Sequence, residues 1–263
     1  MAIIAGEVMQ RYPPVAAVMV LGAVLLALPI AVFPRMPAPG PDRRLASESF
    51  RQFFAEVVGV VRGPQVLLAI AMFVTPASSF ALTNLLGGVG SDYHASPHFV
   101  GAVGGAGVLF AGIVGCLVFP LIDRLLPLRY LYLTIGAVGA LFTLGLILLP
   151  RTPLAFATAL IGENVFQSAA ITTSIAIAFE TIGERNPLAA TTFSVIVSVL
   201  NIPNTYMVVV DGWGYAWRGV GGSLLVDAGA GLAACSLLVL LLRYLAMRRR
   251  AATDGLLGQV RTD

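Results

Sequence analysis

Residues 153–180 read PLAFATALIGENVFQSAAITTSIAIAFE, in which only Glu163 and Glu180 carry a charge. An α-helix rises about 1.5 Å per residue, so roughly 20 apolar residues cross the hydrocarbon core of a bilayer. Six further apolar runs lie at 14–34, 64–90, 98–120, 129–149, 188–210 and 218–243. The chain is therefore predicted to be an all-α membrane protein with about seven transmembrane helices.

The composition favours the same class. Of the 263 residues, 58% are hydrophobic and 11% are charged, and the mean hydropathy is +0.90. A soluble domain carries roughly a quarter charged residues, so a soluble globular protein is excluded. The net charge of +3 favours contact with anionic lipid headgroups over nucleic acid. Cys116 and Cys235 lie inside apolar runs, where they are interpreted as packing residues.

The cationic residues are sixteen arginines and no lysine, and they are unevenly placed. If the gaps between apolar runs are assigned alternately to two sides, only Arg11, Arg151 and Arg218 fall on one side. Cytoplasmic loops keep an excess of cationic residues, so the other side is predicted to be cytoplasmic. We expect an integral protein of a bacterial inner membrane, with its N-terminus outside and its C-terminus in the cytoplasm.

The polar segments divide the chain into four parts. Residues 1–34 hold an outer N-terminus and a first transmembrane helix, which we interpret as retained rather than as a cleaved signal peptide. Residues 35–63 form a cytoplasmic loop, in which an apolar stripe from Phe50 to Val61 predicts an amphipathic interfacial helix. An ordinary connector packed on the helix ends is the alternative for this loop. Residues 64–243 form a six-helix transporter bundle, and 244–263 a disordered cytoplasmic tail.

The segment 211–218, DGWGYAWR, is interpreted as an outer turn with its aromatic residues in the headgroup belt. Asp227 follows about 13 Å inside the outer end of the last run by helix rise. We interpret Asp227 as a capping or pairing residue in a tight helix contact, rather than as a residue of transport.

Glu163 is the most informative polar residue. It lies roughly 15 Å along its helix from Pro153, close to the midplane of a bilayer. Asn164 is adjacent, and Gln167 follows one turn later on the same face as Glu163. Intramembrane acids are costly and tend to be functional, so Glu163 is a candidate for a solute site or for proton coupling. The alternative is a hydrogen-bonded cluster that locks two helices together.

The run 64–90 is interrupted near its middle by Thr75-Pro76, with Ser79 and Asn84 beyond the interruption. Proline removes a backbone donor, so this helix is predicted to be kinked or broken. Such breaks line the solute cavity in transporters, which makes Thr75, Ser79 and Asn84 cavity candidates. A kink that serves packing alone is the alternative.

Several motifs point away from other classes of protein. The glycines of 98–120 lack a preceding strand and a following lysine, so they are small-residue packing seams rather than a nucleotide loop. His94 and His98 have no third ligand nearby in sequence and are interpreted as solvated loop residues. No catalytic constellation is present, so we expect neither an enzyme nor a cofactor.

Residues 121–129 read LIDRLLPLR and place Asp123, Arg124 and Arg129 in a short cytoplasmic loop between two helices. This loop resembles the signature loop of the major facilitator superfamily, whose acid and arginines hold neighbouring helix ends together. The leading glycine of that motif is Phe119 here, and the middle glycine is missing.

The wider resemblance covers essentially the whole chain. The segments 98–129, 184–211 and 211–229 resemble the carboxy-terminal half of that superfamily, most of all its AmpG-type muropeptide permease and acetyl-coenzyme A transporter branch. The resemblance equates the seven runs with helices six to twelve of a twelve-helix carrier. It implies that 64–90 and 153–180 line the cavity, and that an amino-terminal half is missing.

These observations together predict a secondary active transporter that moves a small solute by alternating access and couples the movement to protons. Its expected partners are the solute, the surrounding lipid bilayer and a second transporter half. A non-transporting membrane scaffold, or a truncated inactive remnant, is the alternative. The absence of arginines from the span centres argues against a phosphate-bearing solute. The residues leave sugars, peptides and other anions open as solutes.

Overall fold

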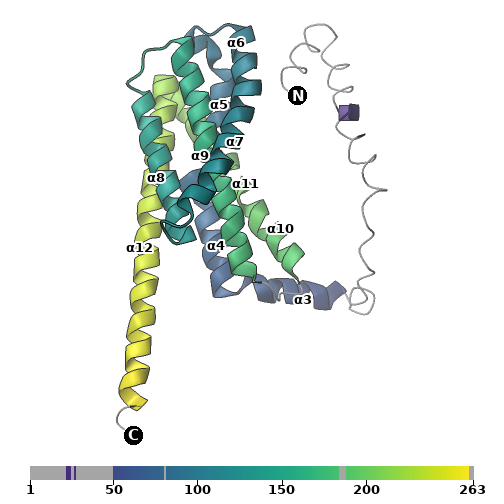
Figure 1. Cartoon of the computed structure of the whole chain (residues 1–263), viewed down its shortest axis with the longest axis vertical. Helices are drawn as coiled ribbons and strands as arrows, with labels where there is room; N and C mark the ends of the chain where they lie inside the picture. The colour runs from purple at the N-terminus through teal and green to yellow at the C-terminus, as the bar shows by residue number, and fades with distance from the viewer. Residues whose placement is uncertain (1–21, 25–26, 28–49, 80, 184–187, 261–263) are drawn as a thin grey trace.

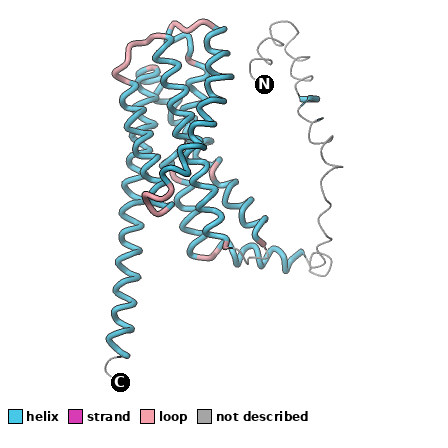
Figure 2. Tube along the Cα trace, in the orientation of Figure 1, coloured by secondary structure: helices cyan, strands magenta, loops and turns pink. Residues whose placement is uncertain are grey.

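The computed structural model describes residues 22–24, 27, 50–79, 81–183 and 188–260, and every regular element in these residues is a helix (Figures 1 and 2). In chain order the elements from residue 50 onward are α3 (Phe50–Val61), α4 (Pro64–Val74), η2 (Pro76–Ser78), α5 (Ala81–Gly88), η3 (Gly90–Tyr93), α6 (Pro97–Ala102), η4 (Val103–Gly107), α7 (Val108–Ile122), α8 (Leu128–Leu146), α9 (Pro153–Ile182), α10 (Ala189–Val199), α11 (Asn201–Arg218) and α12 (Val220–Val260).

Five helical segments are long and apolar enough to cross a membrane, which makes the chain an integral membrane protein by length and composition. They are Pro97–Ile122, Leu128–Leu146, Pro153–Ile182, Ala189–Arg218 and Val220–Arg248. The expected count of seven is not reached. The predicted span 14–34 lies almost wholly outside the described residues, and the run 64–90 forms two shorter helices, α4 and α5.

The helix α9 occupies the centre of the bundle and packs against α4, α5, α7, α8 and α10. It begins where Pro153 follows Thr152, whose hydroxyl accepts the amide of Ala155 at 3.2 Å. The helix α12 packs against α8 and α11 and then extends well beyond the bundle (Figure 1). The helix α3 covers the segment for which the sequence predicts an amphipathic helix, and it lies across the end of the bundle beside α4 and α10 (Figure 1).

Two expectations about irregular structure are wrong. The segment 211–218 is the last part of α11, because Gly219 makes the turn into α12 alone, with a φ of 62°. The predicted disordered tail is helical as far as Val260, because residues 244–252 are rich in strong helix formers and contain no proline.

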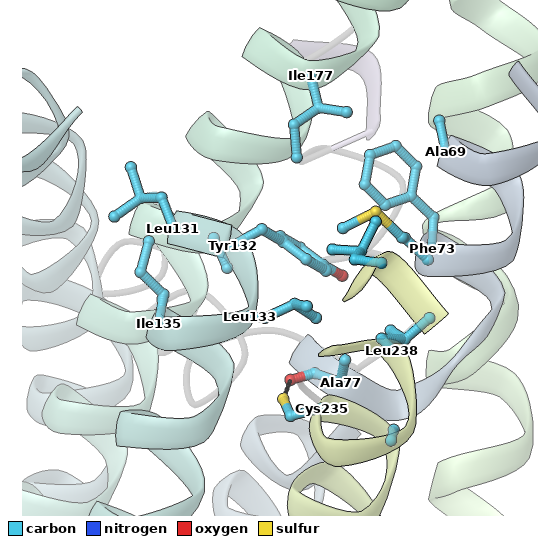
Figure 3. Packing of buried hydrophobic residues seen from close by; sticks show 14 of the residues in the cluster. Ala69, Phe73, Ala77, Leu131, Tyr132, Leu133, Ile135, Ile177, Cys235 and Leu238 are labelled. Atoms are coloured by element: carbon cyan, nitrogen blue, oxygen red, sulfur yellow. Dashed lines mark hydrogen bonds between the residues drawn. The ribbon is translucent and has the colours of Figure 1, made fainter. Parts of the chain in front are cut away.

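Two apolar clusters fill the bundle, one above the other. The Tyr132 cluster is built around Phe73, Tyr132, Ile177 and Leu238, from α4, α8, α9 and α12. Its tyrosine ring meets Phe73 edge-on, with the ring centroids 5.6 Å apart (Figure 3). The helices α8, α9 and α12 continue from this cluster to a second one, whereas α4 ends at Val74 and α5 takes its place.

The Phe156 cluster includes Leu86, Tyr93, Phe156 and Leu224, from α5, η3, α9 and α12. Four segments, from η2, α8, α9 and α12, carry polar or small residues between the two clusters. We call this region, residues 76–79, 139–143, 163 and 227–231, the polar layer. The bundle end nearer the Tyr132 cluster is termed the Arg129 end, and the other the Tyr93 end.

Candidate functional site

The helix break predicted at Thr75-Pro76 is present and forms one wall of the polar layer. The helix α4 ends at Thr75, whose backbone is extended with a ψ of 155°. The segment η2 then makes a single turn, and Ser79 is extended again, with a ψ of 145°, before α5 begins. Pro76 has no amide to donate and disfavours a helical residue before it. The last carbonyl groups of α4 therefore lack helical partners, and the Thr75 hydroxyl donates to one of them, Met72 O, at 2.8 Å.

Glycines let two helices approach this break closely. A Cβ added to Gly136 of α8 would overlap the carbonyl oxygen of Ala77, and one added to Gly231 of α12 would lie 3.5 Å from that of Pro76. The Cys235 thiol of α12 also donates to Ala77 O, at 3.4 Å (Figure 3). The polar backbone of the break is thus held directly between α8 and α12, at the centre of the protein.

Glu163 is 5% exposed and meets this layer from α9. Thr143 Oγ1 lies 2.5 Å from Glu163 Oε1 and 3.0 Å from Gly139 O. A threonine hydroxyl has one proton, so it donates to only one of these acceptors at a time. An ionised Glu163 accepts the Thr143 proton. A protonated Glu163 instead donates to Thr143, which then donates to Gly139.

The pair therefore satisfies the buried carboxyl in either protonation state, by reversing one hydrogen bond. Buried polar groups are costly when they are left without a partner. The Glu163 carboxyl can therefore hold or release a proton without losing its hydrogen-bond partner, although the ionised form still carries a buried charge.

Two further acids are buried at a similar depth. Asp227 is 9% exposed and Asp211 is fully buried, and Asp227 Oδ1 and both carboxyl oxygens of Asp211 lack a hydrogen-bond partner. By helix rise, Asp211, Asp227 and Glu163 lie roughly 10 to 15 Å from the Tyr93 end of their helices. The backbone of Asp211 is tied to α12 by the Ser223 hydroxyl, which donates to its carbonyl oxygen at 2.8 Å.

A small cavity lies in the polar layer. Its space for the centre of a water molecule is about 20 Å³, and its polar lining residues are Ser78, Ser79, Thr143, Glu163 and Asp227. A volume of about 10 to 15 Å³ on this measure is needed for one water, so the cavity has room for about one. The lining includes no arginine or histidine.

The structure brings together only some of the residues that the sequence singles out. Glu163 and Ser79 line the same cavity. Asn164 donates to Leu160 O at 2.7 Å and lines a separate groove between α7 and α9. Gln167 is half-buried and Asn84 is exposed, and neither lines this cavity.

The predicted structural loop lies at the Arg129 end. Arg129 donates to Gln65 Oε1 of α4 at 2.7 Å, so this loop contacts a neighbouring helix through an amide. Asp123 Oδ1 is buried without a hydrogen-bond partner, and Arg124 is exposed.

A second anchor lies at the Tyr93 end. The guanidinium of Arg151 donates to the Tyr93 hydroxyl at 2.7 Å and lies 5.0 Å from its ring centroid. Burial raises the pKa of the Tyr93 phenol, and the charge of Arg151 partly offsets this rise. Arg129 and Arg151 thus lie at opposite ends, away from the buried acids.

Sequence reasoning missed Asp211, because its glycine and tryptophan neighbours are typical of a turn. A signal was available in the glycines. A Cβ on Gly222 of α12 would overlap Gly214 O, so α11 and α12 cross backbone to backbone immediately after Asp211. Gly214 and Gly222, which lie on either side of Gly219, are typical of two closely packed helices rather than of a long loop.

The chain was also compared with known proteins. A scan against protein-family models, a search of curated proteins and a search of solved structures each found no match.

Proposed function

We propose that the chain is one half of a secondary transporter of the major facilitator type, similar to its AmpG-type branch, which moves a small solute by alternating access and couples the movement to protons. The observation that carries the proposal is the buried carboxyl of Glu163 with its reversible hydrogen bond to Thr143. Intramembrane carboxyls of this kind mark proton relays in pumps and transporters.

The surroundings of Glu163 support this role. The residue faces a helix break, and discontinuous helices line the substrate and coupling-ion sites of secondary transporters. The polar layer lies between two apolar clusters, so a solute path through it can be closed on either side by side-chain packing. Thr75, Asn84, Asn164 and Gln167 remain proposed solute contacts, formed when a second half completes the cavity.

The proposal includes a partner and an orientation. The second half supplies five or six spans and the opposite wall of the cavity. The Arg129 end faces the cytoplasm, because the described arginines that are predicted to be cytoplasmic lie in the segments at that end, among them Arg51, Arg62, Arg124 and Arg129 (Figure 1). The protein then belongs to a bacterial inner membrane, with the Tyr93 end outside.

The test is solute uptake into proteoliposomes that hold this chain together with the product of the adjacent upstream reading frame. Neutral sugars, short peptides and small anions are supplied under an imposed inward proton gradient. We expect accumulation of one class, loss of that accumulation in Glu163→Gln, and no loss in Glu180→Gln. Glu180 is a matched control, because it is an exposed glutamate on the same helix.

The rival function is a scaffold or an inactive remnant. If the two-half proteoliposomes accumulate none of these solutes, or if Glu163→Gln accumulates solute like the parent, the proposal fails. The rival then becomes the better description.

A further inference from the structure

The cavity in the polar layer has an unusual excess of oxygen. Two carboxyl groups, Glu163 and Asp227, face it from α9 and α12, and the hydroxyls of Ser78, Ser79 and Thr143 lie around it. Asp227 is 9% exposed and its Oδ1 has no hydrogen-bond partner. Ser78 is half-buried; its Oγ forms no hydrogen bond of good geometry, although it interacts with the Tyr132 hydroxyl. Orphaned buried oxygens that face one small cavity need a ligand that can satisfy them.

The chemistry of these oxygens favours a cation over a neutral ligand. No arginine or histidine lines the cavity. Arg151 contacts Tyr93, Arg218 lies over the ring of Trp217, and Arg129 contacts Gln65, so these three arginines are engaged outside the cavity. Two buried carboxylates without a cationic partner are costly unless they bind a cation or protons. Asp211 on α11 is a third acid that interacts electrostatically with both.

The helix break adds neutral oxygens to this set. The carbonyl groups of Pro76 and Ala77 lie beside the cavity, where Gly231 and Gly136 bring α12 and α8 against them. Unwound backbone carbonyls of this kind coordinate sodium ions or protons in secondary transporters. Mixed carboxylate, hydroxyl and carbonyl oxygens are ligands for hard cations.

The size of the cavity and the number of acids select a monovalent ion. The space of about 20 Å³ holds one water-sized species without a hydration shell. Within the described part of the chain, no group of three or more acids, histidines or cysteines is placed to hold a metal ion. A dedicated divalent site with three charged ligands is therefore not built here.

We infer that Glu163 and Asp227, together with the hydroxyl and carbonyl oxygens of the broken helix, form a binding site for one sodium ion. Protons compete for the same carboxyls. The acids around the ion are Glu163 from α9, Asp227 from α12 and, further away, Asp211 from α11. The Cys235 thiol of α12 and the Tyr132 hydroxyl of α8 are the other titratable groups beside the break, through Ala77 O and Ser78. The segment η2 and α8 contribute hydroxyls at the cavity. This inference deepens the proposed function by naming an ion for its central site, but binding at equilibrium does not require transport.

The experiment is direct binding of ²²Na⁺ to the purified full-length chain in detergent, with choline chloride holding the ionic strength constant. We expect saturable binding that unlabelled NaCl displaces and choline chloride does not. Binding should weaken as the pH is lowered, because protonated carboxyls are poor cation ligands. A second readout is the melting temperature, which should rise with NaCl and not with choline chloride.

Variants assign the site. Glu163→Gln and Asp227→Asn should each weaken sodium binding by about tenfold or more, because each removes one of the two carboxylates that line the cavity. The milder Ser78→Ala should weaken it less, which keeps the test informative if a carboxyl variant fails to fold. Glu180→Gln should bind sodium like the parent.

The outcomes separate this inference from the proposed function. Absence of saturable, sodium-specific binding across the pH range overturns the sodium site, and so does equal binding in folded Asp227→Asn. If only pH changes the melting temperature, the cavity holds protons alone; the sodium site is then wrong while proton-coupled transport stands. If the chain binds sodium but the two halves together accumulate no solute, the sodium site stands and the proposed transport function is wrong.

Discussion

Thr143 is the one hydrogen-bond partner of the Glu163 carboxyl in the described part of the chain, and the two oxygens lie 2.5 Å apart. Because Thr143 also reaches Gly139 O, its hydroxyl can serve as donor or acceptor for Glu163. The two residues come from neighbouring helices, α8 and α9. The protonation state of Glu163 on α9 is thereby linked to the hydrogen bond that Thr143 makes within α8.

Replacing Thr143 tests this link. Thr143→Val keeps the shape and removes the hydroxyl, so Glu163 loses its partner, and the fold should be destabilised by about 1 to 3 kcal/mol. Thr143→Ser keeps the hydroxyl and should retain stability close to that of the parent. The melting temperatures of the two variants in detergent measure the difference, and equal values would show that the hydrogen bond is unimportant.

The close approach of α8 to the helix break gives a second prediction. Gly136→Ala places a methyl group against the carbonyl of Ala77, and overpacking of this kind costs about 1 to 3 kcal/mol or more. Gly145 on the same helix has open space around its Cβ position, so Gly145→Ala should be neutral or stabilising by up to about 1 kcal/mol. The melting temperatures of the two variants measure this difference in stability. A Gly136→Ala protein as stable as Gly145→Ala would contradict the close packing of α8 against Ala77.

The anchor at the Tyr93 end yields a third prediction. Tyr93→Phe removes the hydrogen bond to Arg151 but keeps the ring against the guanidinium, so the expected cost is about 0.5 to 1.5 kcal/mol. Tyr93→Ala also removes the buried ring and should cost about 3 to 5 kcal/mol. Melting temperatures that fail to rank parent, phenylalanine and alanine in this order would argue against the anchor.

Orientation is checked by cysteine labelling in whole cells. In a chain with Cys116→Ala and Cys235→Ala, a cysteine at exposed Trp217 should react with a membrane-impermeant maleimide. A cysteine at exposed Leu126 should react only after the cells are opened. The reverse pattern would invert the proposed topology and place the Arg129 end outside.

The sequence predicted those features that depend on single residues. Pro76 breaks its helix because proline lacks a donor wherever it stands, and Glu163 is conspicuous because it is an acid close to the middle of an apolar run. The family resemblance implied that both segments line a cavity, but which of their side chains meet there could not be predicted, because this depends on how α9 rotates against η2. Asn164 shows the same limit: successive helical residues point in different directions, and it faces α7 instead.

The environment of the two other buried acids, Asp211 and Asp227, was not predicted from the sequence. Asp227 was interpreted as a capping or pairing residue, whereas its carboxyl lines the cavity with an oxygen left unpaired. Asp211 was assigned to a turn that Gly219 makes alone. Both acids lie near the contact of α11 with α12 through Gly214 and Gly222. The glycines indicate that two helices pack closely there, but the side chains that this contact buries depend on how the two helices are rotated against each other.

The most direct test of proton coupling compares two transport modes of the same Glu163→Gln proteoliposomes, with both halves present. Loss of a coupling carboxyl should abolish accumulation driven by a proton gradient, while exchange of labelled for unlabelled solute at equal pH continues at a rate similar to that of the parent. Gradient-driven accumulation that persists in Glu163→Gln would contradict the central claim that Glu163 carries the coupled proton.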